Sequence, residues 1–147
     1  MSLQAQTTGR RHTKITAGEF EFGAEFEEER APKTVAAFKA LMPFHSKIIH
    51  ARWSGESAWV PLGDMDIGIS RDPENATSHP APGQILWYPG GLSETEILFP
   101  YGTARFACVK GPLAGNHFLT IVEGRESLTE LGRLLGWEGA QEISFEA

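Results

Sequence analysis

The stretch between residues 82 and 124 constrains the fold most, because it holds the densest apolar content of the chain. Four short apolar runs follow one another there, and Gly, Pro or Asn residues separate them. Runs of this length, rich in Ile, Leu, Phe, Val and Trp, are typical of β-strands joined by tight connections. We therefore predict that the core sheet contains Gln84–Tyr88, Glu94–Phe99, Ala104–Val109 and His117–Val122.

A first hairpin and a helix are predicted before these strands. Thr13–Ala17 and Glu19–Phe26 form the hairpin, and in the second segment Phe and Glu alternate with period two, which indicates an apolar inner face and an acidic outer face. A helix follows from Pro32, because proline suits a first helical turn and the apolar residues after it recur at spacings of three and four. Pro43 ends this helix.

A second hairpin is predicted from Ser46–Trp53 and Ala58–Leu62, which flank a Ser-Gly-Glu turn. Alternation does not decide which face of the first strand points inward, because both faces carry apolar residues. Ser70–Pro82 is predicted to be an irregular loop, and loops of this length tend to be functional or mobile.

The chain ends with a predicted helix over Ser127–Leu135 and an alternating strand over Glu142–Glu146. Two helices among about eight mostly antiparallel strands predict a mainly β fold, a closed or nearly closed barrel with a helix at each end. The 147 residues suit one domain, which we place at residues 13–147, with a disordered tail or expression remnant over residues 1–12.

Composition excludes several classes of function. The net charge of -6 argues against binding to nucleic acid or to an anionic membrane, both of which need a basic surface. No apolar run approaches the roughly 20 residues of a membrane span, and no apolar segment follows the N-terminal arginines as in a secretory signal. The single Cys108 excludes an internal disulfide and is predicted to be a buried, inert thiol. We expect a cytoplasmic protein.

Several segments resemble cyclophilins. Ala31–Phe38 is similar to the first-helix motif of that family, and Pro43–Ile49 resembles the segment that follows it. Gly115–Phe118 and Ile121–Gly124 resemble the strand that leads to the last cyclophilin helix. The Gly-Gln-Ile-Leu-Trp-Tyr-Pro-Gly-Gly segment at residues 83–91 is closer to a group of small uncharacterised bacterial and archaeal proteins with a cyclophilin-like fold. The resemblance covers about residues 14–147, and one branch of unknown function in that group is matched by Ile49–Pro61 and Ser93–Gly102.

This resemblance implies an eight-stranded barrel with two capping helices and a cleft on one face. It also implies peptidyl-prolyl isomerisation, in which an arginine weakens the resonance of the X-Pro bond against a barrier of ~18–20 kcal/mol. In cyclophilins that arginine directly follows Phe-His, whereas here Ser46 and Lys47 stand there and the nearest arginine is Arg52. The trio that lines the cyclophilin proline pocket has no clear match, but His117 fits the position of the site histidine.

Charged residues beside predicted turns are the first candidates for a binding site. Arg52 and Trp53 lie next to the second hairpin turn, where a guanidinium backed by an aromatic ring suits a carboxylate; the alternative is a surface arginine beside a packed tryptophan. Glu94 and Glu96 lie two residues apart, hence on one strand face, and follow a glycine-rich turn. They are candidate polar ligands or a general base, or an outward polar stripe.

His117, His79 and Tyr101 complete the candidate ligand-binding set. A lone histidine is more often a hydrogen-bonded structural residue, and Tyr101 suits core packing equally well. No HxH, HExxH or CxxC spacing occurs, so we expect neither a metal nor a cofactor. No catalytic residue is assigned, and whether the protein is an enzyme stays open.

Three functions remain as hypotheses. The first is binding of a small polar or carboxylate-bearing molecule in a cleft on the barrel, and the second is prolyl isomerisation. The third is a structural or oligomerising domain, in which exposed aromatic residues such as Trp87 or Trp137 form a homodimer interface.

Overall fold

The structure is a computed structural model, and it describes residues 12–147. The predicted tail lies outside the described residues except for His12, which is the first residue of a strand. The strands and helices in chain order are β1 (His12–Ala17), β2 (Phe20–Phe26), α2 (Pro32–Leu41), β3 (Phe44–His50), β4 (Gly55–Pro61), β5 (Ala76–Thr77), β6 (Gln84–Tyr88), β7 (Glu96–Ala104), β8 (Ala107–Cys108), β9 (Gly111–Pro112), β10 (Gly115–Glu123), the 3-10 turn η1 (Arg125–Ser127), α3 (Leu128–Glu138) and β11 (Gln141–Glu146).

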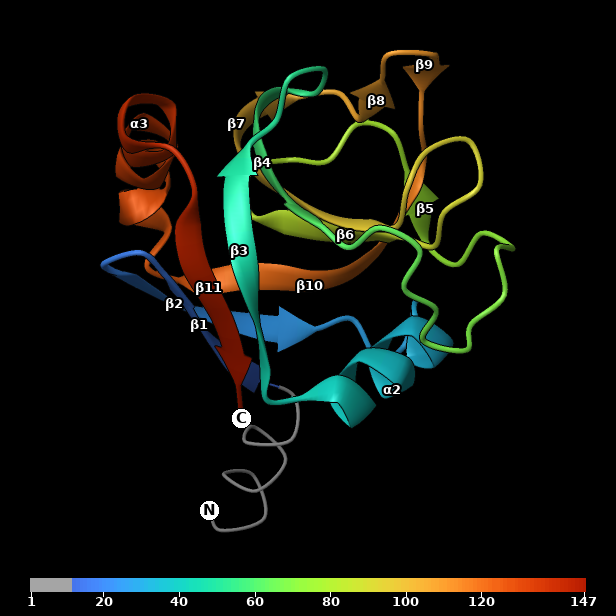
Figure 1. Ribbon diagram of the computed structural model, residues 1–147. Coiled ribbons are helices and arrows are strands. Elements are labelled where there is room, and N and C mark those ends of the chain that lie inside the picture. The colour runs from blue at the N-terminus through green and yellow to red at the C-terminus, as the bar shows by residue number, and fades with distance from the viewer. Residues whose placement is uncertain (1–11) are drawn as a thin grey trace, which may run out of the picture.

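Eight strands close into an antiparallel barrel, in the order β2-β1-β11-β3-β4-β7-β6-β10, because β10 also pairs with β2 (Figure 1). The short strand β5 adds to the other side of β10 at one end, and β8 and β9 form a separate two-stranded sheet. The predicted mainly β barrel of eight antiparallel strands with two helices is confirmed. None of the helices within residues 12–147 is long and apolar enough to cross a membrane.

Side-chain alternation along the strands fills the barrel interior, as the sequence of β2 predicts. Phe22 and Phe26 are buried while Glu21 and Glu25 are exposed. The structure also decides the orientation of β3, which alternation left open: Ile48 is fully buried and Ile49 is 37% exposed. The face that carries Ile48 therefore points inward.

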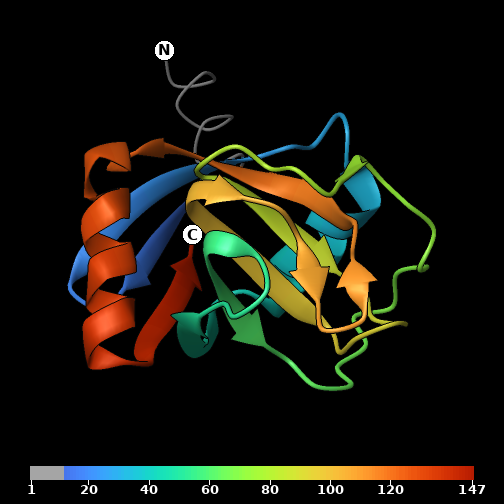
Figure 2. The same ribbon diagram turned by 90° about the horizontal axis from the view of Figure 1, so that it is seen from above.

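Helix α2 closes one end of the barrel with Phe38. The ring of Phe38 makes edge contacts with Phe118 at 5.0 Å, Phe145 at 5.1 Å and Trp87 at 6.2 Å between ring centroids. Helix α3 lies on the opposite side of the barrel (Figure 2) and buries leucines in the same core. Trp87 is only 1% exposed, so the prediction that it is an exposed interface residue is wrong.

The loop between β4 and β6 is fastened to the start of α2 by Glu74. One carboxylate oxygen of Glu74 accepts hydrogen bonds from the Thr34 backbone N–H at 2.8 Å and the Thr34 hydroxyl at 2.7 Å, and the other accepts from the Lys33 N–H at 3.0 Å. The Asn116 side chain accepts the N–H of Glu74 and donates to the Thr34 hydroxyl. Two N–H groups of the first helical turn, which have no partner within a helix, are thus satisfied from outside it.

A second apolar cluster lies on the outer face of the sheet, beneath residues 105–113, which we name the strap. Leu86, Tyr88 and Leu98 point outward into this cluster, whereas their neighbours Ile85, Trp87 and Ile97 point into the barrel. Phe106 and Leu113 of the strap cover them. The predicted core strand over Ala104–Val109 is therefore wrong: Ala104 ends β7, Ala107–Cys108 forms the short β8 outside the barrel, and the buried Phe106 between them packs on the outer face.

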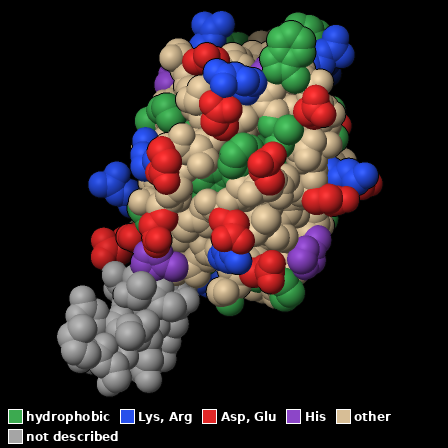
Figure 3. Space-filling model, turned by 90° about the vertical axis from the view of Figure 1, so that its left-hand side faces the viewer, with side chains coloured by type: hydrophobic (Ala, Val, Ile, Leu, Met, Phe, Trp, Pro, Cys, Tyr) green, Lys and Arg blue, Asp and Glu red, His purple; other side chains and the backbone are tan. Residues whose placement is uncertain are grey.

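Charged side chains are mixed on the surface. On the side of the molecule that lies at the left in Figure 1, basic side chains lie next to acidic ones, with small hydrophobic areas between them (Figure 3). This face therefore lacks the continuous basic stripe that a nucleic-acid-binding surface carries.

Candidate functional site

A small pocket lies on the outer face of the barrel, between the sheet, the β3–β4 turn and the strap. Its volume is about 140 Å³. This is smaller than pockets for drug-sized molecules, which have roughly 300–1,000 Å³. It is lined by Ala51, Arg52, Trp53, Ser54, Trp59, Ser93, Glu96, Ala107, Cys108 and Val109. We refer to it as the strap pocket.

Ser54 ties the β3–β4 turn to the strap. Its hydroxyl donates to the Ala107 carbonyl at 3.1 Å and accepts from the Ala107 N–H at 3.1 Å. Its carbonyl accepts from the Ser57 hydroxyl at 3.0 Å. Gly55 follows with φ of +73°, and a Cβ there would lie 2.8 Å from the Thr103 carbonyl, so only glycine fits this position. The turn and the strap therefore form one rigid frame.

Arg52 and Trp53 project from this turn at the mouth of the pocket. The Arg52 guanidinium carbon lies 5.8 Å from the centroid of the Trp53 ring, which is a cation–π distance. Within residues 12–147 the guanidinium has no hydrogen bond or ion pair with another side chain. Its five N–H donors are therefore available to a planar oxyanion.

Glu96 is the buried polar residue of the strap pocket. It is the first residue of β7, opposite Pro61 of β4 and Tyr88 of β6, and is only 6% exposed. Neither carboxyl oxygen has a hydrogen bond or ion pair within residues 12–147. Trp87 Nε1 is the one fully enclosed side-chain polar atom without a partner in that part of the chain, so the Glu96 oxygens are open to the pocket.

Burial raises the pKa of Glu96 to about 8, and the nearby negative charge of Glu94 adds to this effect. The cause is physical: an ionised carboxylate loses its hydration in an apolar pocket and finds no partner there. At pH 7 the side chain is mostly protonated. The strap pocket then carries one positive charge, from Arg52, and a carboxyl group that can donate a hydrogen bond.

Trp59, Ser93 and Cys108 also line the strap pocket but were not among the predicted site residues. Trp59 alternates with the buried Ala58 and Val60, so it points to the outer face, and that alternation was a usable signal. Cys108 is half-buried against the pocket, which corrects the prediction of a fully buried thiol. No local pattern in the sequence places it in the same pocket as Glu96, because that depends on how the strap folds back.

Glu94 lies outside the strap pocket, although it is only two residues from Glu96. Its carboxylate accepts the Gly63 N–H at 3.2 Å and lines a neighbouring open hollow that also contains Arg71. Strand β7 begins only at Glu96, so the assumption of one strand face for both residues does not hold. Glu94 affects the pocket only through its negative charge, which raises the pKa of Glu96.

Tyr101 lies away from the strap pocket and joins α3 to the barrel. Its hydroxyl is 2.7 Å from Nε2 of His50, and its ring occupies the space in which a side chain at Gly132 would lie. Burial raises the pKa of the Tyr101 hydroxyl, and the charge of Glu56 adds to that. Tyr101 therefore packs α3 against the sheet.

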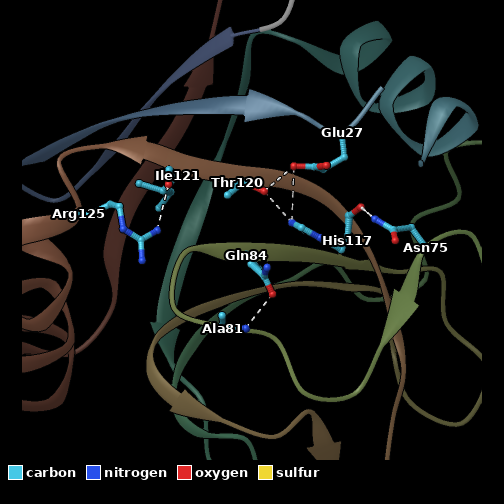
Figure 4. Close-up of polar contacts among 8 residues, drawn as sticks. All are labelled: Glu27, Asn75, Ala81, Gln84, His117, Thr120, Ile121 and Arg125. Atoms are coloured by element: carbon cyan, nitrogen blue, oxygen red, sulfur yellow. Dashed lines mark hydrogen bonds and ion pairs between the residues drawn. The ribbon is translucent and has the colours of Figure 1, made fainter. Parts of the chain in front are cut away.

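His117 belongs to a separate polar cluster with Thr120 and Glu27 (Figure 4). Its Nε2 lies 2.7 Å from the Thr120 hydroxyl, which donates to Glu27 at 2.6 Å, so Nε2 carries the proton. Burial lowers the pKa of His117, which the Glu27 charge opposes only in part. His117 pairs with Leu86 of β6, so β6 separates it from Glu96 on β7, and β6 and β7 together separate it from Trp59 on β4.

His79 lies on the exposed loop after β5, where its backbone N–H donates to the Thr77 hydroxyl at 3.1 Å.

Of the predicted site residues, the structure therefore gathers Arg52, Trp53 and Glu96 in one pocket. Glu94 borders it, and His117, His79 and Tyr101 lie elsewhere. Within residues 12–147 no group of three or more His, Cys, Asp or Glu side chains is arranged to hold a metal ion.

Two larger hollows are less suited to a specific ligand. One, of about 540 Å³, opens between the ends of β1, β2 and β10, where Lys14 already pairs with Glu21 at 3.1 Å. The other, of about 510 Å³, is the hollow beside Glu94. Neither is lined by a buried carboxyl group without a partner.

Comparison with protein-family models matches residues 13–147 to a family described as "Protein of unknown function (DUF3830)". The chain belongs to this family. The match spans all of the barrel, which confirms the expected membership of an uncharacterised family. A search of curated proteins found no match. The relation to cyclophilins stays a prediction.

Two solved structures share the fold. The structure of McbB in complex with tryptophan matches with a TM-score of 0.63 and 18% identity over 91% of this chain and 44% of the McbB chain. The chain therefore spans less than half of McbB. The solution structure of the hypothetical protein AF2241 from Archaeoglobus fulgidus matches with a TM-score of 0.58 and 23% identity over 92% of this chain and 93% of AF2241. At these identities the likeness shows the architecture alone.

Proposed function

We propose that the protein binds a small carboxylate-bearing molecule in the strap pocket. The observation that carries this proposal is the unpartnered carboxyl group of Glu96, buried in the same pocket that the unpartnered Arg52 overlooks. Leaving a buried polar group without a partner costs roughly 1–3 kcal/mol. A ligand that supplies the missing hydrogen bond and a carboxylate for Arg52 recovers that cost.

The chemistry of the walls narrows the class of ligand. Trp53 and Trp59 offer flat apolar surfaces, and the volume of about 140 Å³ suits a small metabolite rather than a peptide or nucleotide. With Glu96 protonated, the net charge of the lining is positive. An aromatic or branched aliphatic carboxylate fits best. The McbB structure holds tryptophan, so amino acids belong in the same ligand panel.

Isothermal titration with matched pairs tests this proposal. Phenylacetate and phenylacetamide share a shape but differ in charge, and L-tryptophan extends the panel. We expect the carboxylates to bind and the amide to bind weakly. Arg52→Ala should weaken carboxylate binding roughly 10- to 100-fold, as for loss of a hydrogen bond to a charged group. Arg105→Ala is the control, because Arg105 is an exposed arginine of the strap that does not line the pocket. Equal affinities of wild type and Arg52→Ala, or no binding by any carboxylate, would overturn the proposal.

Two alternative functions stay predictions, each with its own test. Prolyl isomerisation predicts activity above the uncatalysed rate in a protease-coupled X-Pro assay. A homodimerising domain predicts concentration-dependent sedimentation, and it would use exposed apolar residues such as Trp137, which is 83% exposed, and Val109, which is 71% exposed. A cytoplasmic location likewise stays a prediction.

A further inference from the structure

We propose that Glu96 is the acid–base group of the strap pocket, and that the protein interconverts the keto and enol forms of a small 2-oxo carboxylic acid held by Arg52. This inference rests on the proposed function of the pocket, and it adds a reaction to binding.

The position of Glu96 gives the first argument. The fold does not need a carboxyl group there, because the neighbours of Glu96 on the outer face are Tyr88, Leu98 and Trp59, all of which pack in the outer apolar cluster. An apolar side chain would bury more favourably and leave no unpaired donor or acceptor. Since both oxygens are free of partners within residues 12–147 and open to the pocket, the group is placed to act on something that enters.

The protonation of Glu96 gives the second argument. Burial, aided by Glu94, raises its pKa to about 8, so that near neutral pH both the acid and its conjugate base are populated. A group of this kind is the most effective in proton transfer at working pH. The titratable and charged groups that line the pocket or adjoin Glu96 are Arg52, Tyr88, Glu94 and Cys108. Arg52 is the one cation among them.

The arrangement of the walls gives the class of substrate. Arg52 at the mouth suits the carboxylate and the two tryptophans suit an apolar substituent; Glu96 lines the same small pocket, where it can reach the part of a substrate that lies between those two groups. In a 2-oxo acid that middle part is a carbonyl group with an acidic C–H beside it. A proton shift there needs only a group that takes a proton and returns it, which Glu96 provides.

The reaction balances without a co-reactant. The Glu96 carboxylate takes the proton from carbon 3, and the C–H electron pair forms the double bond between carbons 2 and 3. The carbonyl π pair moves to the oxygen of carbon 2. The Glu96 carboxylic acid then returns the proton to that oxygen, which gives the enol and restores the carboxylate. In D₂O the acid exchanges its proton with solvent, so deuterium enters carbon 3.

Proton NMR in D₂O tests the inference directly. We expect the wild-type protein to exchange the carbon-3 protons of phenylpyruvate or 2-oxobutyrate faster than buffer alone. Glu96→Gln should lose this acceleration by roughly 100-fold or more, in line with general acid–base catalysis. Glu94→Gln is the matched control: it should keep the activity but move the pH profile to lower pH, because the Glu94 charge raises the pKa of Glu96. If Glu96 only positioned the substrate and transferred no proton, the Glu94→Gln substitution would not move the pH profile.

Three results would overturn the inference: wild-type exchange no faster than buffer, Glu96→Gln as active as wild type, or a Glu94→Gln profile that does not move. If Glu96→Gln does not fold, Glu96→Asp takes its place, because it retracts the carboxyl by one methylene and should also lose most of the acceleration. Phenylacetate titration separates the two proposals. Binding without exchange removes the acid–base role and leaves the binding function standing, whereas absence of both removes both.

Discussion

Alternate residues of the same strands build two different regions, the barrel interior and the apolar cluster on its outer face. Inside, Phe38, Trp87, Phe118 and Phe145 fill the barrel, and α2 and α3 cover its ends. Outside, Leu86 and Leu98 belong to a smaller apolar cluster beneath the strap. The strap pocket lies at the edge of this cluster, and Glu96 lines it. Within residues 12–147, bulky aromatic rings pack in the barrel interior, and the candidate pocket lies outside it, beneath the strap. The larger buried cluster lies in the interior, so we expect stability to depend mainly on it, whereas the candidate binding site lies where the strap covers the sheet incompletely.

Removing a central aromatic ring from the barrel interior should lower the free energy of unfolding more than any other substitution considered. Phe38→Ala empties the space between α2 and four other rings, those of Phe44, Trp87, Phe118 and Phe145, and we expect a loss of roughly 3–5 kcal/mol in the free energy of unfolding. Urea denaturation measures this loss. A loss below about 1 kcal/mol would mean that α2 does not close the barrel.

Glu96→Gln should show how much the buried carboxyl group of the strap pocket, rather than the barrel interior, contributes to the pH dependence of the free energy of unfolding. The pKa of Glu96 in the folded protein is about 8, against an ordinary value of 4.5, so the folded state holds the proton more tightly. The contribution of Glu96 is thus fully present below pH 4.5 and is lost as the pH rises through about 8. We expect the wild type to lose roughly 2–4 kcal/mol more than Glu96→Gln between pH 5 and pH 8. Denaturation curves for both proteins at both pH values test this, and parallel pH dependence contradicts it.

Glu74 is the opposite kind of carboxyl group and should respond with the opposite sign. Burial raises its pKa, but the hydrogen bonds from Thr34 and Lys33 outweigh that effect and lower the pKa overall. Its contribution is present above pH 4.5 and is lost as the pH falls. Glu74→Gln should cost about 1 kcal/mol at pH 7, as other helix-start hydrogen bonds do, and less at pH 4. Thermal denaturation at the two pH values measures it. A larger cost at pH 4 than at pH 7 would show that the capping interaction is misassigned.

Val109→Ala should have the smallest effect on stability and a measurable one on binding. Val109 is 71% exposed and lines the strap pocket, so it contributes little to folding. We expect a change in the free energy of unfolding below about 0.5 kcal/mol, together with weaker binding of phenylacetate. Titration and denaturation of the same sample check both. A large loss of stability would place Val109 in the core.

The interior could be predicted from the sequence because its signals are local. Period-two alternation of Phe and Glu in β2 and the apolar face of α2 each lie within one element. Strand β3 shows where local signals end: its two faces are similar in composition, and only pairing with β4 and β11 decides that Ile48 points inward.

The candidate site could be predicted only in part, because it is assembled from distant segments. The positions of Arg52, Trp53 and Glu96 beside turns predict them correctly, whereas the prediction for Glu94 rests on a strand that starts only at Glu96 in the structure. Cys108 was missed because Ala104–Val109 reads as a core strand when Phe106 is assumed to point inward. His117 is predicted from a resemblance alone, and its position on β10 places it beyond β6 from Glu96, in a separate cluster with Thr120.

The most direct test is a carbon-13 NMR titration of the glutamate side-chain carboxyl groups, with the Glu96 signal assigned by its loss in Glu96→Gln. We predict that the Glu96 carboxyl titrates with a midpoint near 8 and that its signal shifts when phenylacetate is added. A midpoint near the ordinary value of 4.5, unchanged by the ligand, would contradict it, since Glu96 would then be hydrated and the strap pocket would not be a closed binding site.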